Sequence, residues 1–212
     1  MATLLLRLAA PLQAWGSSSK FNIRNTEREP TKSGVIGMIA AAKGIQRNDD
    51  LKLLEPLSRL RFGIRVDREG KLLKDFHMVH ESKSSHVTER YYLSDAVFLA
   101  VLESDDKKLL YEIALALKNP VYPLFLGRRS CPPTLPVVLG ISDEALMDAL
   151  ENTAPLVHRN DSYRRIVYES YDGDTVVQDV PVSFSQLHRI HGYRYKREEM
   201  IAVPEHDPMA EL

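Results

Sequence analysis

The order in which strand-like and helix-like stretches follow one another constrains the fold of this chain most. Residues 3–9 form an apolar run that predicts a buried strand, and apolar side chains recur at helical spacing over residues 32–45. An amphipathic stretch that opens with Asp105 and Asp106 predicts a second helix. With the strands described next, the order is strand, helix, strand, strand, helix, strand. This order is typical of a ferredoxin-like (RRM-like) α+β domain, in which helices cover one face of an antiparallel sheet.

The middle of the chain contains one strand more than this order requires. Residues 61–67 and 72–79 predict a hairpin, and residues 91–102 predict an additional strand. We therefore interpret the region 72–102 as an extended, elaborated hairpin. A short strand at residues 122–126 completes the expected domain.

The pattern changes after the first two thirds of the chain. Residues 143–151 predict a short helix, and residues 163–184 predict a hairpin that turns at Asp172-Gly173, a dipeptide favoured in tight turns. We expect two parts, a ferredoxin-like domain over residues 1–140 and a small C-terminal helix with a β appendage over residues 141–212.

The composition is that of an ordinary soluble globular protein. The net charge is −1, so a polyanion site requires local clustering of the 28 Lys and Arg. The single cysteine, Cys131, excludes an internal disulfide and a Cys-rich zinc site, and it fits a reducing cytoplasm. Arg7 interrupts the first apolar run, and no stretch reaches the roughly 18 apolar residues of a membrane span. We expect a cytoplasmic protein without membrane anchor, metal or cofactor.

Two short segments place glycine, hydroxyl and cation where an element starts or stops. The first opens the helix, with Thr31 as its N-cap and Lys32, Ser33 and Gly34 in its first turn. A cation there costs about 0.3–1 kcal/mol, and a glycine costs up to about 1 kcal/mol. A bound phosphate would make the charge of Lys32 favourable at this position and would accept hydrogen bonds from the free amides of the helix start. Close packing of the helix on the sheet, with a solvated Lys32, explains the residues equally well.

The second segment is Gly127-Arg128-Arg129-Ser130, directly after an apolar run. Arginine binds phosphate through two parallel hydrogen bonds and stacks on bases. Two adjacent arginines after a strand therefore favour an anion site. A structural ion pair with surface acids is the alternative.

The loop after the first strand contains Gln13, the only tryptophan, Trp15, and Gly16. A long polar stretch with Arg24 and Arg28 follows it. A loop tryptophan can stack on a base or anchor a protein interface. It can also cap the core.

Histidines in the predicted hairpin raise the question of catalysis. His77, His80, Lys83 and Tyr91 are types of residue that can run metal-independent RNA cleavage. The odd spacing of His77 and His80 places them on opposite faces of a strand, which favours contact with a ligand or partner instead. We assign no catalytic residue.

Basic residues alternate with Tyr193 and Tyr195 near the C-terminus, a pattern that can bind RNA. Glu198 and Glu199 follow at once, so we interpret this stretch as a solvated strand face.

Four blocks of the sequence resemble the CasD-type subunits of type I-E CRISPR Cascade, which belong to the RAMP superfamily. These blocks, in the family's order and spacing, are residues 5–16, 30–34, 44–47 and 126–132.

The resemblance implies a non-catalytic RNA-binding subunit with a ferredoxin-like domain. Such a subunit grips the 5′ handle of the CRISPR RNA and joins the backbone subunit to the large PAM-recognising subunit in antiviral defence, so it meets target DNA indirectly. A hairpin thumb, by position about residues 77–92, presses into the RNA and contacts the adjacent backbone subunit.

Two alternatives stay open. The equivalent subunit of type I-C complexes cuts precursor CRISPR RNA, which keeps a metal-independent endoribonuclease in view. A structural adaptor that joins protein subunits through Trp15 and the thumb is the other.

We predict RNA contacts at residues that carry a donor, a ring or a close backbone approach. These are Gln13, Trp15, Gly16, Arg24, Arg28, Thr31, Lys32, Ser33, Gly34, His77, His80, Tyr92, Gly127, Arg128, Arg129 and Ser130.

Overall fold

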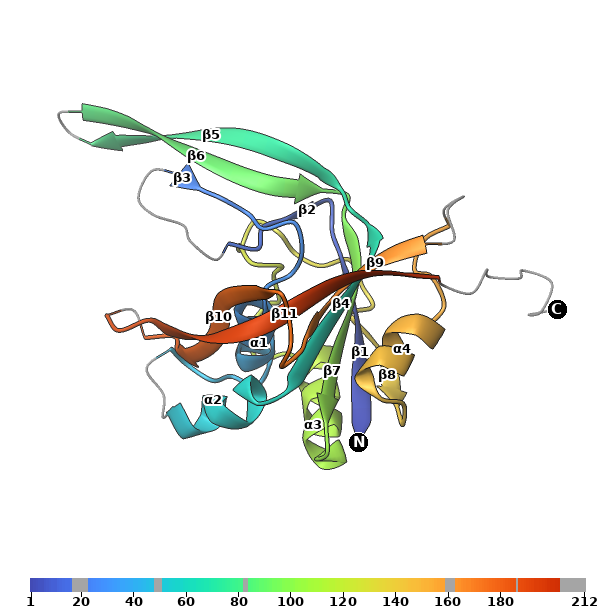
Figure 1. The fold of residues 1–212 in the computed structure, drawn as a ribbon. Helices are drawn as coiled ribbons and strands as arrows, with labels where there is room; N and C mark the ends of the chain where they lie inside the picture. Colours follow the sequence, from blue (N-terminus) through green and yellow to red (C-terminus); the bar gives the residue numbers. More distant parts are fainter. Residues whose placement is uncertain (17–22, 48–50, 82–83, 159–162, 186, 203–212) are drawn as a thin grey trace.

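The computed structural model describes residues 1–16, 23–47, 51–81, 84–158, 163–185 and 187–202 as an α+β protein (Figure 1). Within these residues, a seven-stranded antiparallel sheet forms the body, in the order β10-β11-β9-β4-β7-β1-β8. Its strands are β1 (Ala2–Ala9), β4 (Arg61–Arg68), β7 (Val97–Ser104), β8 (Val138–Ser142), β9 (Tyr163–Glu169), β10 (Thr175–Ser183) and β11 (Ile190–Ala202).

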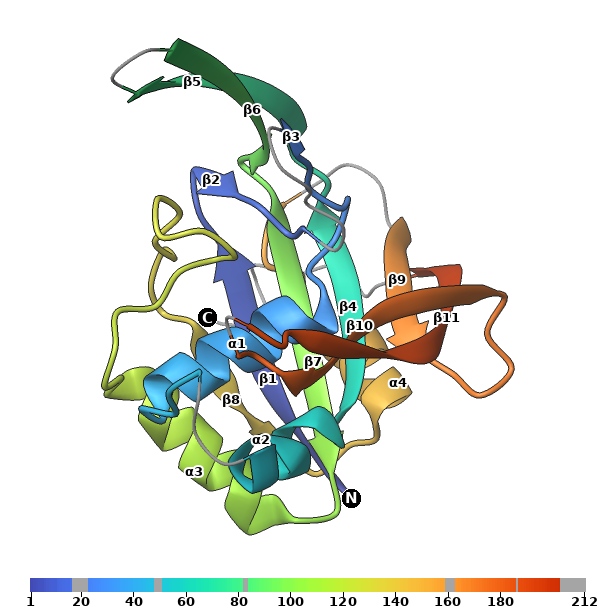
Figure 2. The same cartoon turned by 90° about the vertical axis from the view of Figure 1, so that its left-hand side faces the viewer.

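Helices cover both faces of the sheet. Those of the described residues are α1 (Lys32–Ala42), α2 (Leu51–Ser58), α3 (Lys107–Lys118) and α4 (Leu146–Asn152). Leu4, Leu6 and Leu8 of β1 belong to the same buried cluster as α1, α2 and α3, whereas Leu5 packs with α4. Figure 2 shows α1 and α3 crossing in front of the strands. Because successive side chains of a strand point to opposite faces and both faces are covered, most residues of β1 and β7 are apolar.

The predicted helix starts are confirmed by their caps. The Thr31 hydroxyl accepts the Gly34 amide at 3.2 Å, and the Asp106 carboxylate accepts the Leu109 amide at 3.0 Å. The first helix ends at Ala42 rather than near residue 45, because Gly44 takes a left-handed conformation with φ of +77° that stops it. None of the helices in the described ranges is long and apolar enough to cross a membrane.

The strands β5 (Lys71–Glu81) and β6 (Ser84–Ser94) form a projecting hairpin (residues 71–94) that stands off the body (Figure 1). It is longer than the predicted thumb. The expected pairing of residues 72–79 with residues 61–67 is wrong, because β4 pairs with β7 and β9 instead. Gly70, just before β5, lies close to Ser94 at the end of β6, because a Cβ on Gly70 would be 2.7 Å from the Ser94 carbonyl oxygen. A glycine therefore allows the two ends of the hairpin to approach each other closely.

Two short strands attach the polar segment after β1 to this hairpin. These are β2 (Leu12–Gln13), antiparallel to β6, and β3 (Ile23–Arg24), parallel to it. The strand β6 is therefore held by residues that are 66 to 82 positions earlier in the chain.

The predicted strand at residues 122–126 is wrong. The strand that follows α3 is instead β8, which pairs with β1 and whose residues 138–142 span the predicted domain boundary. Pro120 and Pro123 lack the amide hydrogens that a ladder needs, which explains why this stretch stays irregular.

The predicted C-terminal hairpin is also wrong. Although Asp172-Gly173 turns the chain, β9 and β10 do not pair with each other, because β11 inserts between them and pairs with both. The strands of residues 163–202 therefore extend the main sheet and do not form a separate appendage.

Candidate nucleic-acid interface

The start of α1 binds an anion, and that anion is a carboxylate of the protein itself. Asp179 of β10 accepts the Lys32 amide at 2.8 Å. The same carboxylate accepts Nε and Nη2 of Arg194 at 2.6 and 2.9 Å. All three residues are buried. The amide-rich helix start predicted from the sequence is therefore real, but it is filled from within the chain.

The Lys32 side chain is buried with 2% of its surface exposed, so the interpretation of Lys32 as solvated is wrong. Its ammonium lies 2.9 Å from the Glu169 carboxylate. Burial lowers the pKa of Lys32, and Glu169 opposes that change. Its neighbours Thr31 and Ser33 are buried too. The charge of Lys32 is thus directed inward, away from solvent.

Trp15 caps the core, as the plainer of its interpretations predicted. It is 1% exposed, and its indole Nε1 donates to the Gln13 side-chain oxygen at 3.0 Å. Gln13 in turn donates to the Ala96 carbonyl at 2.7 Å. A Cβ on Gly34 would lie 2.9 Å from the Trp15 ring, so this glycine permits close packing of helix and indole.

The second predicted segment packs against the same stretch of chain. Gly127 has φ of +85°, and a Cβ there would lie 1.7 Å from the Ala14 carbonyl oxygen. The Ala14 amide donates to the Leu126 carbonyl at 3.2 Å. The two segments, nearly a hundred residues apart, are therefore joined through Ala14 and Trp15, beside exposed Gly16.

Arg128 lies at the base of the projecting hairpin. Its guanidinium stacks 4.7 Å above the centre of the Tyr92 ring, and its Nη2 donates to the Arg24 carbonyl at 2.7 Å. Its Nη1 is buried without an acceptor among the described residues. Arg129 and Ser130 beside it are exposed. One guanidinium is thus fixed in position with a free donor.

Arg90 completes an arginine cluster (Arg24, Arg90, Arg128 and Arg129). The register pairs Arg24 of β3 with Arg90 of β6, and the alternation of a strand places Arg90 on the same face as Tyr92. The Nε of Arg90 is likewise buried with no acceptor in the described part of the chain. Sequence reasoning missed Arg90, although its two-residue spacing from Tyr92 was the available signal.

The histidine, lysine and tyrosine of the hairpin do not converge where they are described. His77 lies 2.7 Å from the Asp75 carboxylate. Tyr91 donates to Glu89 at 3.3 Å. It is paired in register with Lys74, so it lies on the opposite face of the hairpin from His77. The side chain of His80 and the whole of Lys83 lie outside the described residues.

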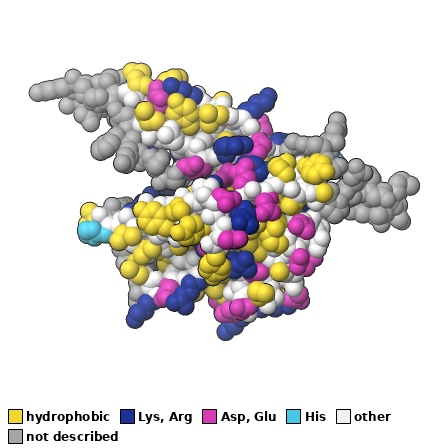
Figure 3. Space-filling view, in the orientation of Figure 1, with side chains coloured by type: hydrophobic (Ala, Val, Ile, Leu, Met, Phe, Trp, Pro, Cys, Tyr) yellow, Lys and Arg dark blue, Asp and Glu magenta, His cyan; other side chains and the backbone are white. Residues whose placement is uncertain are grey.

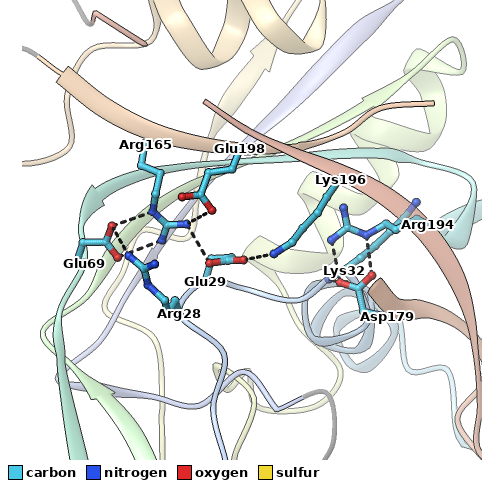
Figure 4. Close-up of polar contacts among 9 residues, drawn as sticks. All are labelled: Arg28, Glu29, Lys32, Glu69, Arg165, Asp179, Arg194, Lys196 and Glu198. Atoms are coloured by element: carbon cyan, nitrogen blue, oxygen red, sulfur yellow. Dashed lines mark hydrogen bonds and ion pairs between the residues drawn. The ribbon is translucent and has the colours of Figure 1, made fainter. Parts of the chain in front are cut away.

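Arg28 belongs to a network of charges that connects four parts of the chain (Figure 4). Arg165 of β9 pairs with Glu69 at 2.8 Å, with Glu29 at 3.1 Å and with Glu198 at 3.3 Å. Arg28 lies 3.6 Å from Glu69, and its side chain is 71% exposed. The network anchors residues 28–29 to the sheet and leaves Arg28 at its solvent edge.

The network also sets the ionisation of its members. Burial by itself would raise the pKa of Glu29, but the hydrogen bond and charge of Lys196 at 2.7 Å, together with Arg165, lower it overall. Burial alone would lower the pKa of Arg165, whereas Glu69 and Glu29 raise it. No cluster of three or more His, Cys, Asp or Glu suited to a metal ion occurs within the described ranges.

The fold and this interface define a class of protein: an α+β domain whose projecting hairpin carries an arginine cluster at its base. A family model described as CRISPR-associated protein (Cas_Cas5) matches residues 3–197. The chain therefore belongs to the Cas5 family of CRISPR-associated proteins.

Individual relatives agree with that assignment. The CRISPR system Cascade subunit CasD of Escherichia coli (strain K12) is 37% identical over 156 residues, which cover 65% of this chain and 70% of that protein. A chain in a solved CRISPR RNA-guided surveillance complex superposes with a TM-score of 0.82 at 34% identity, covering 95% of this chain and 91% of that one. A crystal structure of a Cas protein superposes with a TM-score of 0.78 at 39% identity, and the match covers 97% of this chain and 100% of that one.

The Asp179 contact generates a stability prediction. Asp179→Asn keeps the shape of the side chain but leaves the buried Arg194 guanidinium without its counter-charge, so the free energy of unfolding should fall by about 3–5 kcal/mol. Urea denaturation of the full chain measures it. Asp172→Asn is the matched control, because Asp172 also pairs with an arginine, at 3.0 Å, but is 74% exposed. The control should stay close to wild type; equal losses in both variants would contradict this account.

The Gly127 geometry generates a second prediction. Gly127→Ala should lower the free energy of unfolding by at least about 2 kcal/mol, because the new Cβ meets the Ala14 carbonyl in a left-handed conformation. Gly140→Ala serves as control, since nothing lies within 4 Å of a Cβ there. Thermal unfolding of both variants checks the difference, and an unchanged Gly127→Ala protein would show that the loop is free to move.

Proposed function

We propose that this protein is a non-catalytic RNA-binding subunit of a type I-E CRISPR surveillance complex. In that role it holds the 5′ handle of the CRISPR RNA and joins the backbone subunit to the large PAM-recognising subunit, in cytoplasmic antiviral defence. Target DNA is met indirectly, through the complex. Membership of the Cas5 family supports this role, as do relatives whose names place them in Cascade and in an RNA-guided surveillance complex.

The observation that carries the proposal is the arginine cluster at the base of the projecting hairpin. Arg90 and Arg128 each hold a buried N–H donor that lacks an acceptor among the described residues. Buried donors are normally satisfied, and a phosphate oxygen is the acceptor that arginine binds best. Arg129, exposed beside them, adds a charge that a polyanion would meet first.

The topology supports a ferredoxin-like assignment for the core of the sheet. The order β4-β7-β1-β8, with α1 after β1 and α3 after β7, matches a strand–helix–strand–strand–helix–strand unit in which the last strand lies beside the first. Here β8 has the role that the sequence suggested for residues 122–126.

The projecting hairpin supports contact with a protein neighbour. Several apolar side chains on the face that includes Lys74 are more than half exposed. They are Leu72 at 66%, Phe76 at 60%, Met78 at 60% and Val87 at 52%. Apolar side chains gathered in this way on a projecting element favour burial against a partner, and we assign the backbone subunit to this face.

A holding role is preferred to cutting because the described hairpin residues are not arranged for proton transfer. His77 is bound to Asp75, and Tyr91 faces the other side of the strand pair. A general acid and a general base would have to converge on one phosphate.

The experiment that tests the proposal removes both adjacent arginines. Arg128→Ala with Arg129→Ala should weaken binding of handle RNA at least tenfold. If both bind phosphate, the slope of log affinity against log salt concentration should become shallower by about 1.4. Fluorescence anisotropy over a salt series with EDTA measures both quantities, and gel analysis of the same samples should show intact RNA.

Lys107→Ala with Lys108→Ala is the control, because these two adjacent exposed cations lie on α3, far from the hairpin (Figure 1). This variant should retain wild-type affinity and salt slope. Unchanged binding after loss of both arginines would overturn the assignment of the cluster, and RNA cleaved in EDTA would overturn the non-catalytic role.

A further inference from the structure

A pocket of about 270 Å³ lies between the start of α1, the strand β4 and the strands β10 and β11. It lies beside the Asp179 contact and is separate from the arginine cluster. Phe62, Ile64, Val167 and Val177 give it apolar walls, and Gln178 and Thr31 add polar atoms. Its volume is just below the 300–1,000 Å³ of sites for drug-sized ligands, so it suits something smaller.

Arg194, which belongs to the pocket lining, has a buried donor without an acceptor among the described residues. Arg194 is 8% exposed, its Nε and Nη2 are fixed by Asp179, and its guanidinium lies 5.3 Å from the centre of the Phe62 ring. Its Nη1 is buried and unpartnered in the part of the chain that the structure describes. Figure 4 shows two nitrogens of the guanidinium bonded to Asp179, with the third nitrogen pointing away from that carboxylate. A buried cationic N–H of this kind calls for an acceptor from outside the chain.

The charge of the lining argues against a phosphate in this pocket. Two cations, Arg194 and Lys196, face three acids, Glu27, Glu29 and Asp179. Arg194 is committed to Asp179 and Lys196 to Glu29. A neutral ligand with a carbonyl or ring-nitrogen acceptor and apolar faces fits better, and a nucleobase is such a group.

The surroundings of the pocket fit a single-stranded nucleic acid. Val176 and Gln178, which belong to the pocket lining, are exposed on β10, so the pocket reaches the surface of the protein. Figure 3 shows hydrophobic side chains gathered over β10 and β11, below the projecting hairpin. The segment 27–31 that borders the pocket also carries Arg28, at the solvent edge of the charge network.

We propose that this pocket receives one unstacked nucleobase of the bound RNA, and that an acceptor on the base takes the free N–H of Arg194. The inference rests on the proposed RNA-binding function and adds to it a site that reads a base, separate from the arginine cluster that meets phosphate.

An abasic scan of the RNA tests the proposal on the full-length chain. Handle RNAs with a single abasic position each are compared with intact RNA by fluorescence anisotropy. One position should lose about tenfold in affinity, in the range of one stacked and buried base, while most others change little. If no position stands out although intact RNA binds, the pocket proposal is overturned and the proposed function survives. If wild-type protein does not bind intact RNA, both fall.

Two variants locate the sensitive position. Val177→Phe fills the pocket, and Arg194→Lys keeps a charge on Asp179 but removes Nη1. Each variant should bind intact RNA about tenfold more weakly than wild type. In each variant, the abasic substitution at the sensitive position should cause no further loss of affinity. Val182→Phe, on the same strand outside the pocket lining and 44% exposed, is the matched control and should behave as wild type. An abasic loss that persists in both folded variants places the base elsewhere and overturns the proposal. Thermal unfolding establishes which variants are folded.

Discussion

The contact on which most of this structure depends is the buried Asp179 carboxylate. It accepts the first amide of α1 and both nitrogens of the Arg194 fork, so it joins a helix from the first part of the chain to two strands from the last. A helix start with unsatisfied amides needs an acceptor, and a buried arginine needs a counter-charge. One side chain meets both needs, and removing it would leave both groups uncompensated.

This contact also decides where a polyanion can bind. With Asp179 bound to the first amide of α1 and Lys32 paired to Glu169, the helix start has no uncompensated charge left for a phosphate. The second predicted segment keeps its chemistry, because Gly127 fits against Ala14 and aims Arg128 at the base of the projecting hairpin. The anion site expected at two places is therefore supported at one, where Arg90 joins it.

Local signals predicted the helices α1, α3 and α4 and the buried strands β1 and β7 well, whereas α2 was not predicted. The caps Thr31 and Asp106 and the apolar runs of β1 and β7 are readable within a few residues of sequence. Most of the errors concern partners far away in the chain. Neither a phosphate contact nor a solvated side chain, the two alternatives for Lys32, anticipated its acidic neighbours, because Asp179 and Glu169 lie 147 and 137 residues further on. The chain does turn at Asp172-Gly173, as predicted, but the strands on either side of the turn do not pair. No local rule indicates that β11 inserts between them. Arg90 became a candidate only when the register placed it beside Arg24.

The central proposal for this Cas5-family chain is that it holds RNA at the base of its projecting hairpin. Photo-crosslinking of the RNA that co-purifies with the complex isolated from cells tests it most directly, with sequencing of the RNA and mass spectrometry of the crosslinked peptides. The account predicts a CRISPR RNA with an intact 5′ handle, crosslinked to residues 127–130 and to the hairpin. A complex that carries no RNA or unrelated RNA, or crosslinks confined to surfaces away from the hairpin base, would contradict it.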